Sequence, residues 1–333
     1  MINGTDLRNA MISGANYIAK FRSSVDEMNI FPVPDGDTGT NMSMTMANAA
    51  ATLEKDGEIP APIGDVARTA ASGLLRGARG NSGVILSLLF RGFADGLQGK
   101  EEADGAELAD ALGLGVDAAY KAVMKPTEGT ILTVARVACE QGKAAAQQDD
   151  DVVHVWEAIC TGANEALEQT PDLLPVLKKA GVVDAGGKGL CYILEGMLSV
   201  FRDGIVLQQD DIEEDAPADI RTDDFFRSAA AEFDQDIRYT YCTEFIVGRD
   251  PACKKDPESL RTYLQKIGDC VVVVSDDDII KTHVHTEVPN KALEAALTYG
   301  QLLTVKIENM KEQHRRAKEK NSAALAAAEK EKL

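Results

Sequence analysis

The chain has 333 residues, of which 44% are hydrophobic and 27% are charged, and its formal net charge is −19. A single hydrophobic core usually stops growing near about 250–300 residues, so the length predicts two domains. The acidic balance excludes a nucleic-acid-binding face, which needs dense positive charge, and no apolar run approaches the roughly 20 residues of a membrane span. The N-terminus lacks a basic start and an apolar leader, so we expect no signal peptide, no membrane insertion and a cytoplasmic location.

The first two thirds of the chain are helical in pattern. Residues 5–202 are rich in Ala, Leu, Gly and Met, recur with helical period and contain few runs of β-branched residues. They predict an all-α domain over residues 1–205. Its eight predicted helices cover residues 5–27, 39–57, 63–78, 82–98, 104–124, 130–147, 152–169 and 187–202.

A different pattern begins after an acidic linker. Over residues 206–236, aspartate and glutamate surround Pro217 and leave little to bury. Strands are then predicted at 238–248, 270–275, 278–287 and 302–307, and helices at 257–268 and 290–299. The order βαββαβ predicts a ferredoxin-like α+β domain over residues 237–310, with both helices on one face of a four-stranded sheet. Residues 311–333 lack an apolar stripe and predict an exposed, charged helical tail.

The segment NIFPVPDGDTGTNM, between the first two predicted helices, carries the strongest chemical signal. Its prolines stiffen the approach and its glycines permit unusual backbone angles, so the carboxylates of Asp35 and Asp37 can be held in place. Such oxygen ligands suit Mg²⁺, which shares its remaining positions with substrate phosphates. The next helix opens with free N–H groups that would face the same anion, at Thr38, Gly39, Thr40 and Asn41. For an isolated Asp-Gly-Asp a simple capped turn is the better interpretation, so the metal assignment depends on companion segments.

Three further glycine-rich segments also open predicted helices: GARGNSG at 77–83, PTEGT at 126–130 and DAGGKG at 184–189. They recur about every two helices, and connections one hairpin apart lie at the same end of an up-and-down bundle. We therefore expect all four loops to converge on one mouth. No Walker A loop and no kinase-type glycine-rich strand loop is present, so helix N-termini and metal would hold the phosphates. The predicted cofactor-binding residues are Ser82 and Gly83 near the β-phosphate, Asn81 in the same segment, Arg79 and Thr130 at the rim, and Asp184, Gly186 and Gly187 near the base or ribose.

A second candidate metal site lies in the ferredoxin-like domain. His283 and His285 project from one face of the predicted third strand, and Cys242 faces the same way on the neighbouring first strand. One thiolate and two imidazoles select Zn²⁺. An exposed histidine pair beside a packed thiol explains the same residues equally well. Most of the cysteines are expected to be small buried residues rather than disulfides: Cys139, Cys160, Cys191, Cys242, Cys253 and Cys270.

The segments NIFPVPDGDTGTNM, GARGNSGVILS, PTEGTILTVAR and VDAGGKGLCYILEG together resemble the DhaL (DAK2) family, related to the L-subunit of dihydroxyacetone kinase. More closely, with YCTEF and KTHVHT, they are similar to the catalytic subunits of bacterial fatty acid kinases. The resemblance implies an eight-helix barrel that binds ATP through two Mg²⁺ ions, and a structural zinc in the second domain. Dihydroxyacetone kinase relatives have three carboxylates in the first loop, and here Asn29 stands upstream where the third ligand would be expected.

The resemblance also implies the acceptor. It would be the carboxylate of a fatty acid presented by a separate fatty-acid-binding protein, which would become an acyl phosphate. A carboxylate is already ionised near neutral pH, so no general base is required. Asp35, Asp37 and Arg79 would then act by positioning and by neutralising charge. The larger relatives carry an additional C-terminal domain, so we expect this chain to be truncated.

Three functions stay open at this point. The first is a kinase subunit for a protein-delivered fatty acid, and the second is a dihydroxyacetone-type kinase subunit with a partner that holds a small ketose. The third is a non-catalytic nucleotide-binding scaffold that docks partners through the zinc domain. The acidic linker and the second domain favour the first. The sequence leaves acceptor chain length and homodimer formation open.

Overall fold

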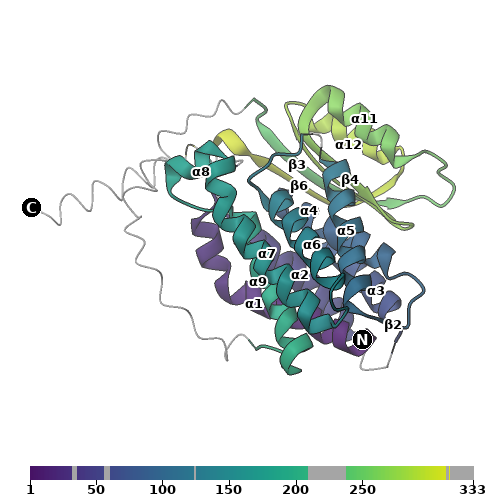
Figure 1. The fold of residues 1–333 in the computed structure, drawn as a ribbon. Helices are drawn as coiled ribbons and strands as arrows, with labels where there is room; N and C mark the ends of the chain where they lie inside the picture. Colours follow the sequence, from purple (N-terminus) through teal and green to yellow (C-terminus); the bar gives the residue numbers. More distant parts are fainter. Residues whose placement is uncertain (32–35, 56–60, 124, 209–237, 313–314, 316–333) are drawn as a thin grey trace, which may run out of the picture. The chain divides into compact units, whose positions relative to one another are not determined.

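The computed structural model describes residues 1–31, 36–55, 61–123, 125–208, 238–312 and 315 (Figure 1). These residues divide into two compact units, a helical unit up to residue 208 and a sheet-containing unit from residue 238. The predicted ligand Asp35, most of the predicted linker and nearly all of the predicted tail lie outside the described residues.

The helical unit is a ring of long helices. Their bounds, with one short helix and two short strands, are β1 (Ile2–Asn3), α1 (Gly4–Glu27), α2 (Thr38–Lys55), α3 (Ile63–Gly77), α4 (Gly80–Gly96), β2 (Glu102–Ala103), α5 (Gly105–Ala122), α6 (Ile131–Ala146), α7 (Val152–Leu173), α8 (Pro175–Ala180) and α9 (Ala185–Asp203). Leaving aside the short α8, each helix packs against the next along the chain, and α9 packs against α1 (Figure 1). The predicted eight-helix up-and-down barrel is therefore confirmed for the residues that the structure describes.

Local capping explains several helix starts. Asn3 accepts the backbone N–H of Asp6, whose carboxylate accepts the N–H of Asn3 in return, at 3.1 and 3.0 Å. Asp104 and Glu107 form the same reciprocal capping box at the start of α5. Such signals are readable in the sequence, and the predicted helix ends fall within a few residues of the observed ones.

Three elements were not predicted: α8, β1 and β2. The six-residue α8 runs from Pro175 to Ala180 and is capped by Gly181, whose φ of 69° is left-handed. Strand β1 pairs with β2 through the partners Ile2 and Ala103, about a hundred residues apart. All three elements are too short for periodicity to reveal them.

Trp156 anchors α7 in the centre of the ring. It is the only tryptophan of the chain, it is buried, and its indole N–H donates to the carbonyl oxygen of Leu194 on α9 at 3.0 Å. The rings of Phe93 and Phe201 meet it edge-on, with centroids at 6.5 and 5.0 Å. Trp156 therefore reports on the packing of the helical unit alone.

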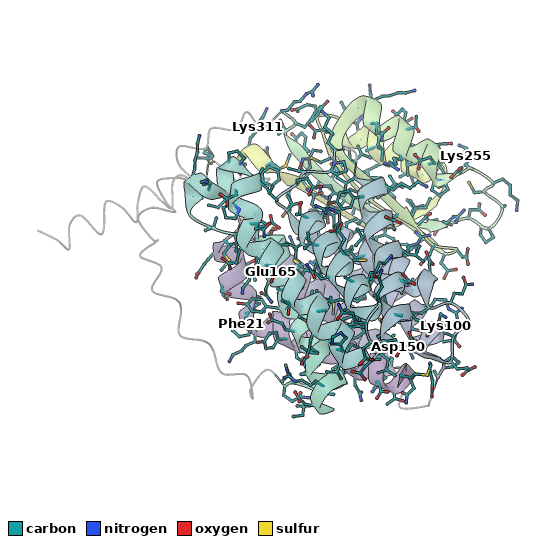
Figure 2. All side chains as sticks on the ribbon, in the orientation of Figure 1. Phe21, Lys100, Asp150, Glu165, Lys255 and Lys311 are labelled. Atoms are coloured by element: carbon teal, nitrogen blue, oxygen red, sulfur yellow. The ribbon has the colours of Figure 1, made fainter. Side chains whose placement is uncertain are left out.

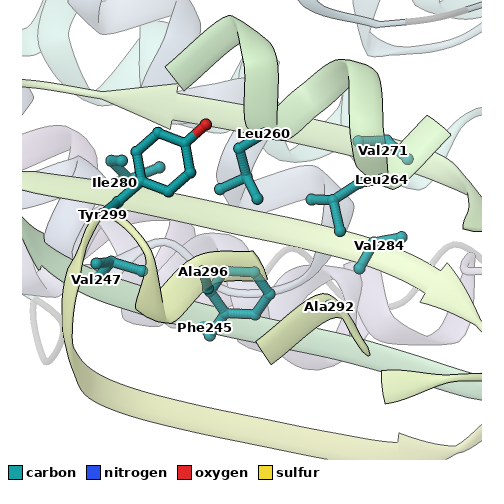
Figure 3. Packing of buried hydrophobic residues seen from close by; sticks show 10 residues of the cluster. All are labelled: Phe245, Val247, Leu260, Leu264, Val271, Ile280, Val284, Ala292, Ala296 and Tyr299. Atoms are coloured by element: carbon teal, nitrogen blue, oxygen red, sulfur yellow. The ribbon is translucent and has the colours of Figure 1, made fainter. Parts of the chain in front are cut away.

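The sheet-containing unit has the predicted ferredoxin-like order. Its elements are β3 (Tyr241–Arg249), α11 (Pro257–Ile267), β4 (Gly268–Ser275), β5 (Ile279–Thr286), α12 (Pro289–Leu297) and β6 (Gly300–Asn309). The strands pair antiparallel in the order β4-β5-β3-β6. Buried side chains such as Phe245, Val284 and Leu264 fill the space between the sheet and the two helices (Figure 3). The α+β prediction is confirmed.

Charged residues such as Glu165, Lys255 and Lys311 are exposed on the outside of their units (Figure 2). Among the described helices, none combines the length and the apolar character that crossing a membrane requires.

We predict that Leu74→Ala lowers the free energy of unfolding of the helical unit by about 2–5 kcal/mol, because Leu74 on α3 is fully buried. Urea unfolding followed by Trp156 fluorescence measures this. Leu114→Ala is the matched control, since Leu114 is 49% exposed and its truncation should change stability by less than about 0.5 kcal/mol. Equal losses in the two variants would contradict the packing described here.

Candidate functional site

The first turn of α4 lies against the first turn of α2. Gly80 has a φ of 58°, and a Cβ there would sit 2.6 Å from the amide nitrogen of Asn41, so only glycine fits. The backbone N–H of Arg79 donates to the hydroxyl of Thr45 at 3.3 Å. Asn81, Ser82 and Gly83 complete this turn of α4. The GARGNSG and DGDTGTN segments therefore meet.

The first turn of α9 joins the other segments. A Cβ on Gly189 would lie 2.7 Å from the sulfur of Met42 in α2. The carboxylate of Asp184 accepts the backbone N–H of Gly187 at 2.7 Å and also that of Ile131, the first residue of α6. The starts of α4, α2, α9 and α6 thus form one continuous cluster at one end of the helical unit.

Two side chains from the end of α1 and the loop after it hold the start of α2. The carboxylate of Asp26 accepts the backbone N–H and the hydroxyl of Thr40, at 2.9 and 2.7 Å. The side-chain oxygen of Asn29 accepts the hydroxyl of Thr38 at 2.7 Å, and both residues are buried. The sequence analysis missed Asp26, because a residue fourteen positions before Thr40 gives no local capping signal.

The charges at this end suit a cation together with an anion. Four helix N-termini present partial positive charge, whereas the carboxylates of Asp26 and Asp37 are negative. Asp37 is half-buried directly before α2, and its carbonyl oxygen accepts the N–H of Asn41 at 2.8 Å. Arg79 is exposed at the N-cap of α4. A phosphate bound at this end would be repelled by the carboxylates unless a cation balanced them, and carboxylate oxygens are ligands that Mg²⁺ accepts.

Asp184 joins two helices. It is 5% exposed, and burial raises the pKa of its carboxyl to about 6, although the hydrogen bonds from Gly187 and Ile131 oppose the rise. Its carboxylate is engaged by backbone amides of α9 and α6, and Gly186 and Gly187 lie in the same turn. A contact between Asp184 and a base or ribose stays a prediction.

The PTEGT segment is held by a polar network. The carboxylate of Glu128 accepts the hydroxyls of Tyr120 and Thr133 at 2.9 and 2.7 Å and pairs with Arg136 at 3.1 Å. Thr130 N-caps α6 beside it. Glu128 was part of the sequence motif without an assigned role, and the structure shows it fixing the loop between α5 and α6.

The candidate zinc residues gather on one face of the sheet. Cys242 lies opposite His285, and Glu244 lies opposite His283, in the pairing of β3 with β5. Val284 packs into the core below the helices, so the two histidines project from the other face. The potential ligand atoms of Cys242, His283 and His285 all lie within 4.8 Å of one another.

Each histidine ring has one nitrogen near a carboxylate. Nδ1 of His283 is 3.0 Å from Glu244, and Nδ1 of His285 is 3.8 Å from Asp269. The two Nε2 atoms face each other at 3.2 Å. Metal-ligating histidines show this pattern, in which a carboxylate fixes the ring while the other nitrogen binds the metal.

The pKa shifts within the cluster indicate that it favours a positive charge beside Glu244 and Cys242. Burial opposes ionisation of Glu244, yet its hydrogen bond with His283 lowers the pKa of the carboxyl to about 2. Burial likewise disfavours protonated His283, but Cys242 and Glu244 raise its pKa to about 10. Burial and the neighbouring His283 lower the pKa of His285 to about 3. One sulfur and two nitrogen donors with carboxylate support fit Zn²⁺.

Comparison with protein families gives two matches. The model of the DAK2 domain matches residues 32–199, and the model of the middle domain of fatty acid kinase A-subunit-like proteins matches residues 238–317. The first covers half of the chain.

Curated relatives include an uncharacterised protein of Staphylococcus aureus strain USA300, 43% identical over 323 residues, with 94% of this chain and 57% of the relative covered. Another, from Staphylococcus haemolyticus strain JCSC1435, is 42% identical, with 94% and 56% covered. This chain therefore spans little more than half the length of these relatives. Among solved structures, the dihydroxyacetone kinase of C. freundii aligns with a TM-score of 0.42 at 17% identity, over 58% of this chain and 34% of that one.

We predict that Asp184→Asn flattens the pH dependence of stability of the helical unit between about pH 4 and pH 7. The carboxyl has a pKa of about 6 in the folded chain and about 3.9 when unfolded. Its raised pKa therefore favours the folded state below pH 4, and that stabilisation, about 3 kcal/mol, is lost as the pH rises through 6. Urea unfolding at several pH values measures the slope, and an identical slope in the variant would show that Asp184 does not titrate as described.

Proposed function

We propose, on the premise that this chain belongs to the DAK2 domain family, that it is the ATP- and Mg²⁺-dependent part of a phosphotransferase. The observation that carries the proposal is the cluster formed by the starts of α2, α4, α6 and α9. Backbone N–H groups of these turns would bind the phosphates. A cytoplasmic location, where ATP is abundant, is part of the same proposal.

The helical domain, residues 1–205, would bind the nucleotide. Asp35 and Asp37 would hold the magnesium, two ions by family resemblance, which neutralises charge on the transferred phosphoryl group. Asn29 already accepts the Thr38 hydroxyl, so we assign it to orienting the loop beside the metal. Arg79, exposed at the rim, is free to approach the phosphate or the acceptor.

We infer that the acceptor is the carboxylate of a fatty acid delivered by a separate acyl-binding protein. The match of residues 238–317 to the middle domain of fatty acid kinase A-subunit-like proteins supports this acceptor over a small ketose. A carboxylate oxygen would attack the γ-phosphorus, and the bond to the β–γ bridging oxygen would break, leaving ADP and acyl phosphate. No proton has to be removed, so this chain's residues need only position the substrates and neutralise the charge on the transferred phosphoryl group.

The sheet-containing domain, residues 237–310, would bind one zinc through Cys242, His283 and His285. We assign this zinc to structure or to partner docking. Its support is the orientation of the two rings by Glu244 and Asp269.

We predict that Asp37→Asn weakens Mg²⁺-dependent ATP binding on the order of 100-fold, because one charge-assisted contact worth about 3 kcal/mol is lost. Calorimetry with and without Mg²⁺ measures the effect. Asp65→Asn is the matched control: Asp65 follows Gly64, whose N–H donates to Lys100 beyond the end of α4, so it lies at the opposite end of the barrel. Unchanged affinity in Asp37→Asn would refute the metal assignment.

Metal analysis of the purified chain is expected to find about one zinc per chain, and Cys242→Ala should abolish it. Cys253→Ala serves as the control, since this half-buried thiol contacts the carbonyl oxygen of Thr298 instead. Zinc-free wild-type protein would contradict the site.

A phosphotransfer assay separates the candidate functions. With ATP, Mg²⁺ and an acyl-binding protein loaded with fatty acid, acyl phosphate should form, and no product should form from dihydroxyacetone held by a ketose-binding partner. Transfer to the ketose alone would favour the dihydroxyacetone-type kinase. ATP binding without transfer to either acceptor would favour a nucleotide-binding scaffold.

A further inference from the structure

Asp26 lies at a position that helix electrostatics disfavour. It is in the last turn of α1 together with Glu27, and this turn contains no basic residue. The C-terminal end of a helix carries partial negative charge, so an acidic side chain there is destabilising unless another group compensates it. The compensation comes from the start of α2, whose partial positive charge lies at this carboxylate.

Both oxygens of the Asp26 carboxylate contact Thr40. Oδ1 accepts the backbone N–H of Thr40 at 2.9 Å, and Oδ2 accepts its hydroxyl at 2.7 Å. The sequence predicts a free N–H at Thr40 for a phosphate, whereas here a carboxylate of the chain occupies it. Asp26 therefore binds this end of α2 in the way that a ligand anion would.

Tight packing against α1 and the loop after it holds the rest of this turn. A Cβ on Gly39 would clash with the carbonyl oxygen of Arg22 in α1, so the two backbones approach closely there. The hydroxyl of Thr38 donates to the side-chain oxygen of Asn29 at 2.7 Å. Asp37 stands directly before the turn, so its place depends on how the turn is held.

We propose that Asp26 is a positioning residue of the magnesium site, which fixes the first turn of α2 so that Asp37 is held ready for the metal. The inference deepens the proposed function and rests on it. Asp26 binds Thr40 rather than the metal. Its negative charge also offsets the partial positive charge at the start of α2, which would otherwise repel a cation beside Asp37. Replacing residues that support metal ligands in this way weakens metal binding by about 10–100-fold.

Magnesium titration of ATP binding tests this role in the full chain. In Asp26→Asn and in Thr40→Val, the Mg²⁺ concentration that gives half-maximal ATP binding should rise about 10–100-fold. Thr40→Ser keeps the hydroxyl and should show a smaller rise than Thr40→Val. The double variant should resemble Asp26→Asn alone, because both changes remove the same contact. Glu27→Gln is the matched control, since it removes a negative charge from the same turn at an exposed position, and its titration should match that of the wild type.

Thermal unfolding without ATP and Mg²⁺ separates positioning from simple structural support. Thr40→Val keeps the backbone N–H and is the milder change, so it guards against a folding defect in Asp26→Asn. If both variants lose thermal stability but keep the Mg²⁺ dependence of the wild type, the contact only supports the fold and the inference is overturned. An Asp26→Asn titration equal to that of Glu27→Gln would overturn it as well. A wild type whose ATP binding does not respond to Mg²⁺ would instead overturn the proposed metal site, and this inference with it.

Discussion

Helix α9 packs against α1 and closes the helical ring, and this contact determines which helix ends lie at the same opening of the ring. At this contact the hydroxyls of Ser13 and Ser199 lie 3.0 Å apart, and small residues let the two helices approach closely. In an up-and-down ring, every second helix starts at the same end. Because successive long helices run in opposite directions around the closed ring, α2, α4, α6 and α9 all begin at one end, and the N–H groups of their first turns face the same space.

Side chains of the protein accept hydrogen bonds from some of these N–H groups. The carboxylate of Asp26 accepts the backbone N–H of Thr40, and that of Asp184 accepts backbone N–H groups from both α9 and α6. These contacts tie the start of α2 to the end of α1, and the starts of α9 and α6 to each other. Asp26 and Asp184 are among the acidic residues that give the chain its formal net charge of −19. Under the proposed function, a metal ion bound by the acidic loop would offset this charge when the phosphates of a nucleotide bind.

The two units offer different kinds of potential metal ligand. The loop before α2 offers carboxylate oxygens, which suit a hard cation that exchanges with substrate. The open face of the sheet offers sulfur and imidazole nitrogen, which suit a metal that stays in place. The contrast is one of ligand chemistry, with oxygen in the helical unit and sulfur and nitrogen in the sheet-containing unit.

Most of the fold and the meeting of the four loops could be predicted from the sequence, and the features that could not be predicted have physical causes. Long helices and the βαββαβ order follow from periodicity and capping, and the meeting of the four loops follows from their spacing of two helices. The hydrogen bond from Thr40 to Asp26 depends on how α1 packs against α2, which no local pattern encodes. A β-bulge at Cys270 in β4 shifts the register by one residue without a glycine or proline to mark it. Asp184 N-caps α9, and its bond to Ile131 exists only because α9 and α6 start side by side.

Hydrogen exchange read by mass spectrometry tests the central claim most directly. Adding ATP with Mg²⁺ should slow amide exchange in the first turns of α2, α4, α6 and α9 together, and ATP with a chelator should not. Protection confined to one of these turns, or found at the starts of α3, α5 and α7, would contradict a shared nucleotide mouth.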